Sequence, residues 1–174
     1  MGIFSKTQNT PNTLTAAEVS ALWLQYLGDS MSICVYKYFL AIVENKEIKP
    51  ILEEALKLSE NHVKKITQFL KRANFQIPTG FTEHDVNVNA PRLFSDQFLL
   101  FYSYKMTIHG LTAYSLAITN AERQDIQNFF LNARKHRRNC SKKLWNWLKR
   151  SRNLQVYLPS LPLMWRSLSV TRIH

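Results

Sequence analysis

The apolar residues of this chain recur at alternating intervals of three and four positions, the spacing of one face of an α-helix. One such stripe lies within residues 24–41, a second within 50–73, a third within 99–116, and a weaker fourth begins at Ile126. The pattern therefore predicts an all-α fold of four helices. We expect the first and third stripes to face the core; they consist of Leu24, Leu27, Met31, Cys34, Tyr38 and Ala41, and of Leu99, Tyr102, Met106, His109, Ala113 and Leu116.

The starts of three helices carry local signals. Thr15 followed by Glu18 has the spacing of a capping box, in which each residue bonds the backbone of the other. Pro50 suits the first turn of the second helix, and Ser95 is a good N-cap for the third. These signals fix where the helices begin.

A passage of 21 residues without a helical pattern, 74–94, separates the second and third helices. The preceding helix, 50–73, would be about 36 Å long. A loop of this length can span roughly 70 Å when extended, so it can return to the starting end of that helix. The second and third helices would then be parallel, within two antiparallel hairpins. This arrangement is the ferritin-like four-helix bundle with one long crossover.

Length, charge and cysteine content narrow the class of protein. A chain of 174 residues suits one domain, with a flexible N-terminus over 1–14 and the bundle over 15–133. No apolar run is long enough for a membrane span and no signal peptide is recognisable, so we expect a cytoplasmic protein. Two distant cysteines, Cys34 and Cys140, indicate neither a disulfide framework nor a zinc knuckle.

The candidate chemistry is sparse. A di-iron bundle needs Glu-x-x-His motifs, but His62 follows Ser59 and His109 follows Met106 at that spacing. Asp29 lies about two positions off the apolar stripe of the first helix, so we expect no core carboxylate there. We therefore predict no catalytic and no cofactor-binding residues.

His62 and His109 are the remaining metal candidates. The crossover topology would put them at similar height, where they either hold a single transition metal or are two hydrogen-bonded core histidines. The second reading is favoured because no carboxylate or thiol completes a ligand set. In the crossover, Glu83, His84 and Asp85 form either an exposed ligand cluster or, more commonly, a turn fixed by its own side chains.

Three segments resemble an uncharacterised ferritin-like family of spore-forming bacteria, loosely labelled as related to the spore coat. They are EIKPILEEAL at 47–56, IPTGFTEHDVNVNAPRLFSD at 77–96 and QFLLFYSYKM at 97–106. The resemblance covers roughly 13–133. It implies an all-helical bundle, no catalytic residues to carry over and a role in sporulation. Larger relatives resemble two copies of the unit in tandem, which implies that a one-copy chain pairs with itself.

Residues 134–174 form an atypical basic tail. All 12 acidic residues precede it, whereas 11 of the 23 basic residues lie within it and account for the net charge of +11. The resemblance ends at Ala133, and we hypothesise that the tail is a frameshifted reading. If it is genuine, helix four continues to about residue 149 and the basic residues bind nucleic acid or an anionic surface. The residues that would complete helix four are Leu144, Trp145, Trp147 and Leu148.

The sequence thus favours a non-enzymatic helical structural or interaction protein. Its expected partners are copies of itself or other spore proteins, with a place in sporulation or the spore coat. The alternative is a metal-binding ferritin-like protein that uses His62 and His109.

Overall fold

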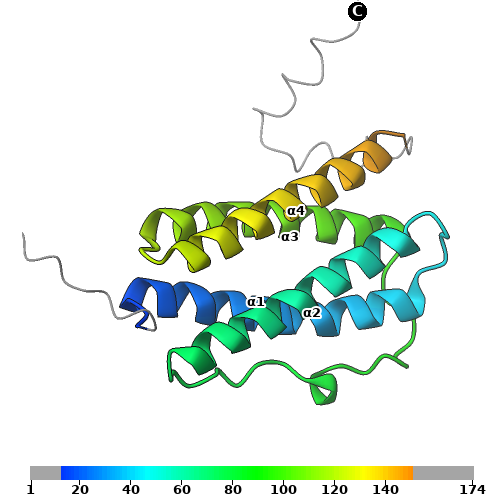
Figure 1. Cartoon of the computed structure of the whole chain (residues 1–174). Helices are drawn as coiled ribbons and strands as arrows, with labels where there is room; N and C mark the ends of the chain where they lie inside the picture. Colours follow the sequence, from blue (N-terminus) through cyan, green and yellow to red (C-terminus); the bar gives the residue numbers. More distant parts are fainter. Residues whose placement is uncertain (1–12, 151–174) are drawn as a thin grey trace, which may run out of the picture.

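The structure, a computed structural model, describes residues 13–150 and contains four long helices (Figure 1). They are α1 (Ala16–Ile42), α2 (Lys49–Arg72), α3 (Asp96–Asn120) and α4 (Gln124–Arg150). A single 3-10 turn, η1 (Glu83–Asp85), interrupts the passage between α2 and α3, and no strand occurs within the described residues. The prediction of an all-α four-helix bundle is confirmed, whereas the ferritin-like label stays a prediction.

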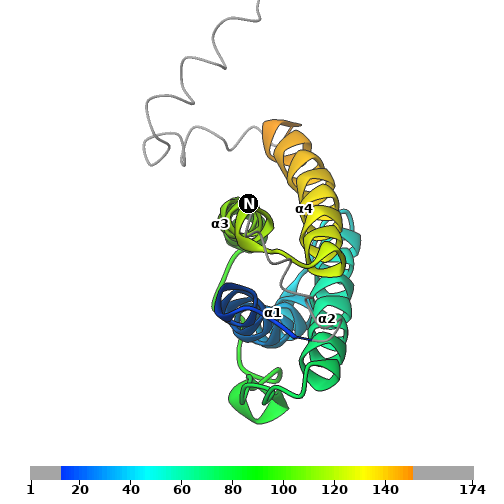
Figure 2. The same ribbon diagram turned by 60° about the vertical axis from the view of Figure 1, so that its left-hand side comes forward.

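The bundle consists of two antiparallel hairpins, α1 with α2 and α3 with α4 (Figures 1 and 2). Seen along the helices, α1 and α3 lie on one side and α2 and α4 on the other (Figure 2). Each helix therefore runs antiparallel to both of its neighbours. The two parallel helices α2 and α3 lie diagonally opposite each other.

The crossover between α2 and α3 lies along the outer side of α1 (Figure 1). It is fixed there by three side chains of α1. Ser30 Oγ accepts from the backbone N–H of Phe81 at 3.1 Å, Cys34 Sγ donates to the carbonyl of Thr82 at 3.1 Å, and Tyr38 Oη donates to the carbonyl of Pro91 at 2.8 Å. The passage therefore spans the length of the bundle, as its residue count predicts.

Two backbone positions allow this path. Asn74, just after α2, has a φ of 57°, in the left-handed region that asparagine tolerates. A Cβ on Gly80 would lie 2.7 Å from Tyr26 Cε1 and 2.8 Å from Ser30 Oγ, so the crossover approaches α1 more closely than a larger residue allows. Thr82 caps η1, and its backbone N–H bonds Asp85 at 2.7 Å.

The predicted capping box at the start of α1 is present. Thr15 N–H donates to Glu18 Oε2 at 2.8 Å, and Glu18 N–H donates to Thr15 Oγ1 at 3.2 Å. Glu18 is 1% exposed, and its other oxygen accepts the backbone N–H groups of Glu122 and Arg123 at 3.0 and 2.7 Å. One carboxylate thus ties the start of α1 to the loop between α3 and α4.

The predicted core stripes of α1 and α3 are partly wrong. Leu24 and Leu116 are 70% and 64% exposed, and Ala41, His109 and Ala113 are exposed as well. The stripes that do face the core are rotated from these and contain many polar residues. They comprise Leu22, Gln25, Asp29, Ser32, Tyr36 and Phe39 on α1, and Leu100, Ser103, Thr107, Gly110, Tyr114 and Ala117 on α3, with Gln25 and Gly110 only partly buried.

The apolar core has two parts, one toward each end of the bundle. One gathers around Leu22, Ile66 and Phe130, and the other around Phe39, Leu52 and Leu100. On α4, a regular stripe passes through both parts; its members are Ile126, Phe130, Ala133, Arg137, Cys140 and Leu144. None of the described helices combines the length and apolarity that a membrane span requires.

Candidate functional site

A cluster of polar side chains lies inside the bundle, between the two apolar parts of the core. We call it the buried polar cluster and define it as Gln25, Asp29, His62, Tyr114 and Arg137. It draws on all four helices, because Gln25 and Asp29 are on α1, His62 on α2, Tyr114 on α3 and Arg137 on α4. The cluster therefore joins all four helices through side-chain hydrogen bonds.

Asp29 is the centre of this cluster and is fully buried. Its Oδ2 lies 2.6 Å from Gln25 Nε2 and 3.0 Å from His62 Nδ1, and its Oδ1 lies 3.4 Å from Arg137 Nη2. An isolated buried carboxylate would be very costly, so these three partners are what allows Asp29 to remain in the core. Our expectation of no core carboxylate on the first helix is therefore wrong.

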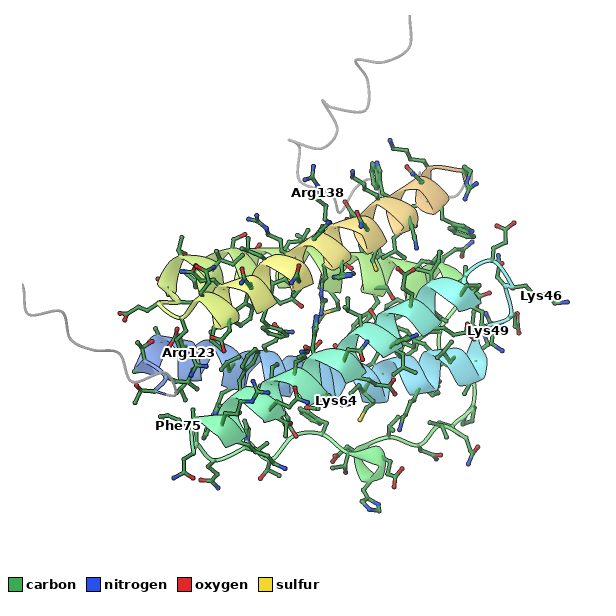
Figure 3. All side chains as sticks on the ribbon, in the orientation of Figure 1. Lys46, Lys49, Lys64, Phe75, Arg123 and Arg138 are labelled. Carbon is green, nitrogen blue, oxygen red and sulfur yellow. The ribbon has the colours of Figure 1, made fainter. Side chains whose placement is uncertain are left out.

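Arg137 uses its three guanidinium nitrogens on three different groups. Besides Asp29, it donates from Nε to Tyr114 Oη at 3.0 Å and from Nη1 to the carbonyl of Met106 at 3.2 Å. A Cβ on Gly110 would lie 2.9 Å from Arg137 Cδ, so the absence of a side chain there makes room for the arginine. Its neighbour Arg138 points away from the bundle (Figure 3).

The environment of the cluster shifts two pKa values upward. Burial disfavours the charge on Arg137, but the facing Tyr114 and Asp29 outweigh it, and the pKa of Arg137 is raised. Burial raises the pKa of Tyr114 to about 12, although Arg137 opposes the rise. The arginine therefore stays charged and the tyrosine stays neutral over the ordinary pH range.

The orientation of His62 follows from Asp29. Nδ1 of His62 lies 3.0 Å from Asp29 Oδ2, and we assign the ring proton to Nδ1 so that it donates a hydrogen bond to the carboxylate. The ring packs edge-on against Phe129 and Tyr114, with centroid distances of 5.4 and 6.1 Å. The hydrogen bond between His62 and the cluster is made by Nδ1, and Nε2 forms none with the other members.

An open groove of about 580 Å³ lies between α2 and α4, and His62 lines it. We call it the α2–α4 groove. Its apolar lining includes Phe69 and Phe129, and its basic lining residues are Lys57, Lys65, Arg72 and His136. His62 is thus the member of the buried polar cluster that lines this groove.

A second notable surface lies on α1, α3 and the crossover, and we call it the outer apolar face. A hollow of about 340 Å³ within it is lined by residues of all three segments, among them Met31, Phe81 and Tyr102. Leu24 is on the same stripe of α1 as Met31, and Leu116 on the same stripe of α3 as Tyr102. The large exposed apolar residues of this face are Leu24, Phe81, Leu93, Phe94 and Leu116, at 70, 47, 69, 37 and 64% exposure.

The two histidines chosen from the sequence lie in different environments. His62 is 5% exposed and hydrogen-bonded to Asp29, whereas His109 is exposed on the diagonally opposite helix α3. No hydrogen bond joins them in residues 13–150, and no group of three or more potential metal ligands occurs in that range. Metal binding through His62 and His109 stays a prediction, as does the presence of a transition metal.

The remaining sequence predictions concern the crossover and the two ends of the chain. His84 is exposed in η1, where the capping box of Thr82 and Asp85 holds the turn. The described part of the basic tail, 134–150, continues α4 and contributes Cys140 and Leu144 to the core. The residues 1–12 and 151–174 lie outside the described part, so a frameshifted tail and nucleic-acid binding by it stay predictions.

Gln25, Tyr114 and Arg137 were missed by reading the sequence. The signal that could have found Arg137 is its place on the stripe of α4, three residues before Cys140 and four after Ala133. A charged residue at a core position requires a buried partner of opposite sign, which would have directed attention to Asp29. Gln25 and Tyr114 carry no comparable signal.

Comparisons with known proteins agree with an all-helical fold. The family model described as "Protein of unknown function (DUF3231)" matches residues 2–154, so the similarity extends beyond Ala133, where we had placed its end. No functionally curated protein gave a significant match.

Two solved structures resemble the fold. One, described as a "putative spore coat protein" of Bacillus halodurans C-125, is 18% identical with a TM-score of 0.70. The match covers 79% of this chain and 89% of that one. The other, a conserved hypothetical protein of Mycobacterium tuberculosis, is 17% identical with a TM-score of 0.63, covering 76% and 97% of the two chains. At these identities the likeness concerns the fold alone.

Proposed function

Since the chain belongs to the DUF3231 family, whose function is unknown, we propose a function from its geometry: it is a non-enzymatic helical protein that assembles with copies of itself. The outer apolar face is the surface that makes the contact. This proposal includes a place in sporulation or the spore coat. The likeness in fold to the Bacillus halodurans protein supports that placement.

The exposure of large apolar side chains on one face is the observation that carries the proposal. Leu24, Leu93 and Leu116 are each more than 60% exposed. Single exposed leucines are ordinary, but several large exposed apolar residues on neighbouring segments are typical of a protein contact. The face surrounds a hollow, which gives a partner side chain a place to insert.

A second copy suits this face better than an unrelated partner. The helices α1 and α3 are antiparallel neighbours, so the pair can pack on the same pair of another copy about a two-fold axis. Gly28 lies on the stripe of Leu24 and Met31, and a Cβ there would meet nothing within 4 Å. Without a side chain at this point, the helix of the second copy can approach α1 closely.

The test is the oligomeric state of the full chain by size-exclusion chromatography with light scattering. We expect a dimer or larger assembly, and we expect Leu116→Glu to dissociate it because a charge would be buried in the contact. Leu131→Glu is the matched control, since Leu131 is 37% exposed but lies on α4. A wild-type chain that is monomeric at about 100 μM would refute the proposal.

A further inference from the structure

The α2–α4 groove has the chemistry of a small-molecule site that the proposed assembly does not use. It lies on α2 and α4, whereas the outer apolar face lies on α1, α3 and the crossover. Its volume of about 580 Å³ is within the usual range for small ligands. The two surfaces can therefore be occupied independently.

His62 presents a polar atom to this groove. Its Nδ1 is held by Asp29, and among the described residues the one buried side-chain nitrogen or oxygen without a hydrogen-bond partner is Arg123 Nη1. Nε2 of His62 makes no hydrogen bond in the described part of the chain, so it is reached by solvent from the groove. A 95% buried ring is thus oriented by the core with one nitrogen open to a ligand.

The charges around the groove favour an anion. Its two acidic residues are already neutralised, Glu54 by Lys143 at 2.6 Å and Asp125 by Arg123 at 2.7 Å. Lys65 and Arg72 lie three and ten residues after His62 on α2, which places all three on one stripe of the helix. Neither cation forms an ion pair within the described residues, so their charges are available to a ligand.

The floor of the groove favours an apolar, flat body. Phe129 packs against both His62 and Phe69, with centroid distances of 5.4 and 5.6 Å. Phe69 and Phe129 both line the groove, and Phe129 is partly exposed, so an aromatic or short aliphatic group can pack there. An inorganic anion would leave this surface uncovered.

We propose that the α2–α4 groove binds an organic carboxylate, with its apolar body over Phe69 and Phe129 and its carboxylate against Lys65 and Nε2 of His62. Lys65 supplies the positive charge. The Nε2 nitrogen donates a hydrogen bond to the carboxylate when it carries a proton. The charged or titratable groups around the ring are Asp29 from α1, Tyr114 from α3, Arg137 and His136 from α4, and Lys65 on its own helix.

The experiment is isothermal titration of the full chain with 1-naphthoate. We expect one saturable site, with binding about tenfold weaker in Lys65→Met because a charge-assisted contact is lost. Lys64→Met removes a neighbouring exposed lysine that does not line the groove, and should change the affinity less than about twofold. His62→Asn keeps a donor for Asp29 but lacks Nε2, and should weaken binding several-fold.

Two further ligands sharpen the result. The neutral 1-naphthylmethanol should bind at least about tenfold more weakly than 1-naphthoate, and inorganic phosphate should not compete. Absence of saturable binding up to about 5 mM would overturn the proposal, as would equal weakening by Lys64→Met. Equal affinity for the alcohol, or competition by phosphate, would also overturn it. Leu116→Glu should bind normally, so that this test stays separate from that of assembly.

Discussion

The middle of the bundle is unusually polar, whereas its outer apolar face is unusually hydrophobic for an exposed surface. The interior at this level holds a carboxylate, an arginine, a histidine and a tyrosine, whereas the face on α1, α3 and the crossover exposes leucines and phenylalanines. In most small bundles the pattern is the reverse. The difference shows that burial in this fold is decided by which groups find partners, and not by hydrophobicity alone.

The two regions also differ in what completes them. Each member of the buried polar cluster has at least one hydrogen-bond partner within the cluster. The outer apolar face lacks a cover in the described part of the chain, and on our proposal a second copy provides it. We therefore expect the cluster to act on folding and helix alignment, and we propose that the face acts on assembly.

The largest expected effect comes from removing the charge at the centre of the cluster. Asp29→Leu leaves Arg137 buried without its carboxylate and should lower the free energy of unfolding by about 3 to 5 kcal/mol in urea denaturation. Asp125→Asn is the control, because the Asp125–Arg123 pair is partly exposed and such pairs contribute about 1 kcal/mol or less. Equal losses of stability in the two variants would mean that the buried Asp29–Arg137 pair contributes no more than a partly exposed ion pair.

Two leucines on α1 allow the contributions of the interior and of the outer apolar face to stability to be compared. Leu22 is fully buried, so Leu22→Ala should cost about 3 kcal/mol of stability, whereas Leu24→Ala should cost about 0.5 kcal/mol or less in the dissociated chain. The same denaturation experiment measures both, with the background variant Leu116→Glu keeping the chain monomeric. Equal losses of stability in the two variants would mean that Leu24 belongs to the core, as the hydrophobic pattern predicts.

The buried hydroxyl of Tyr114 makes the stability of the folded chain depend on pH. Its pKa is raised to about 12 in the folded chain, so the unfolded chain loses this proton first as the pH rises. The stabilisation is full below pH 10 and is lost between about pH 10 and 12, amounting to about 3 kcal/mol. Denaturation across this range should show the loss in the wild type and a smaller one in Tyr114→Phe.

The smallest effect concerns the two thiols. Burial raises the pKa of both Cys34 and Cys140, with Asp85 adding to the rise at Cys34 and Glu54 at Cys140. At pH 7 each thiol should react with an aromatic disulfide reagent more slowly in the folded chain than in urea. Rates that are the same in both states would mean that the thiols are open to solvent.

The sequence predicts the frame of the fold better than its interior. The capping box at Thr15 and the length of the crossover are local signals, and both are confirmed. The core stripes predicted for α1 and α3 are wrong at Leu24 and Leu116, which are exposed. Ranking positions by hydrophobicity placed these leucines in the core and left the buried Asp29 outside it. The cost of burying Asp29 is offset by the opposite charge of Arg137. The two residues are 108 positions apart, so a local sequence pattern does not reveal that they are partners.

The buried polar cluster depends on the pair of Asp29 and Arg137, which we expect to stabilise each other inside the bundle. A double-mutant cycle with Asp29→Leu and Arg137→Met, followed by urea denaturation, tests it most directly. We expect a coupling energy of about 2 kcal/mol or more, with the double variant more stable than Asp29→Leu alone. A coupling energy below about 0.5 kcal/mol would contradict it.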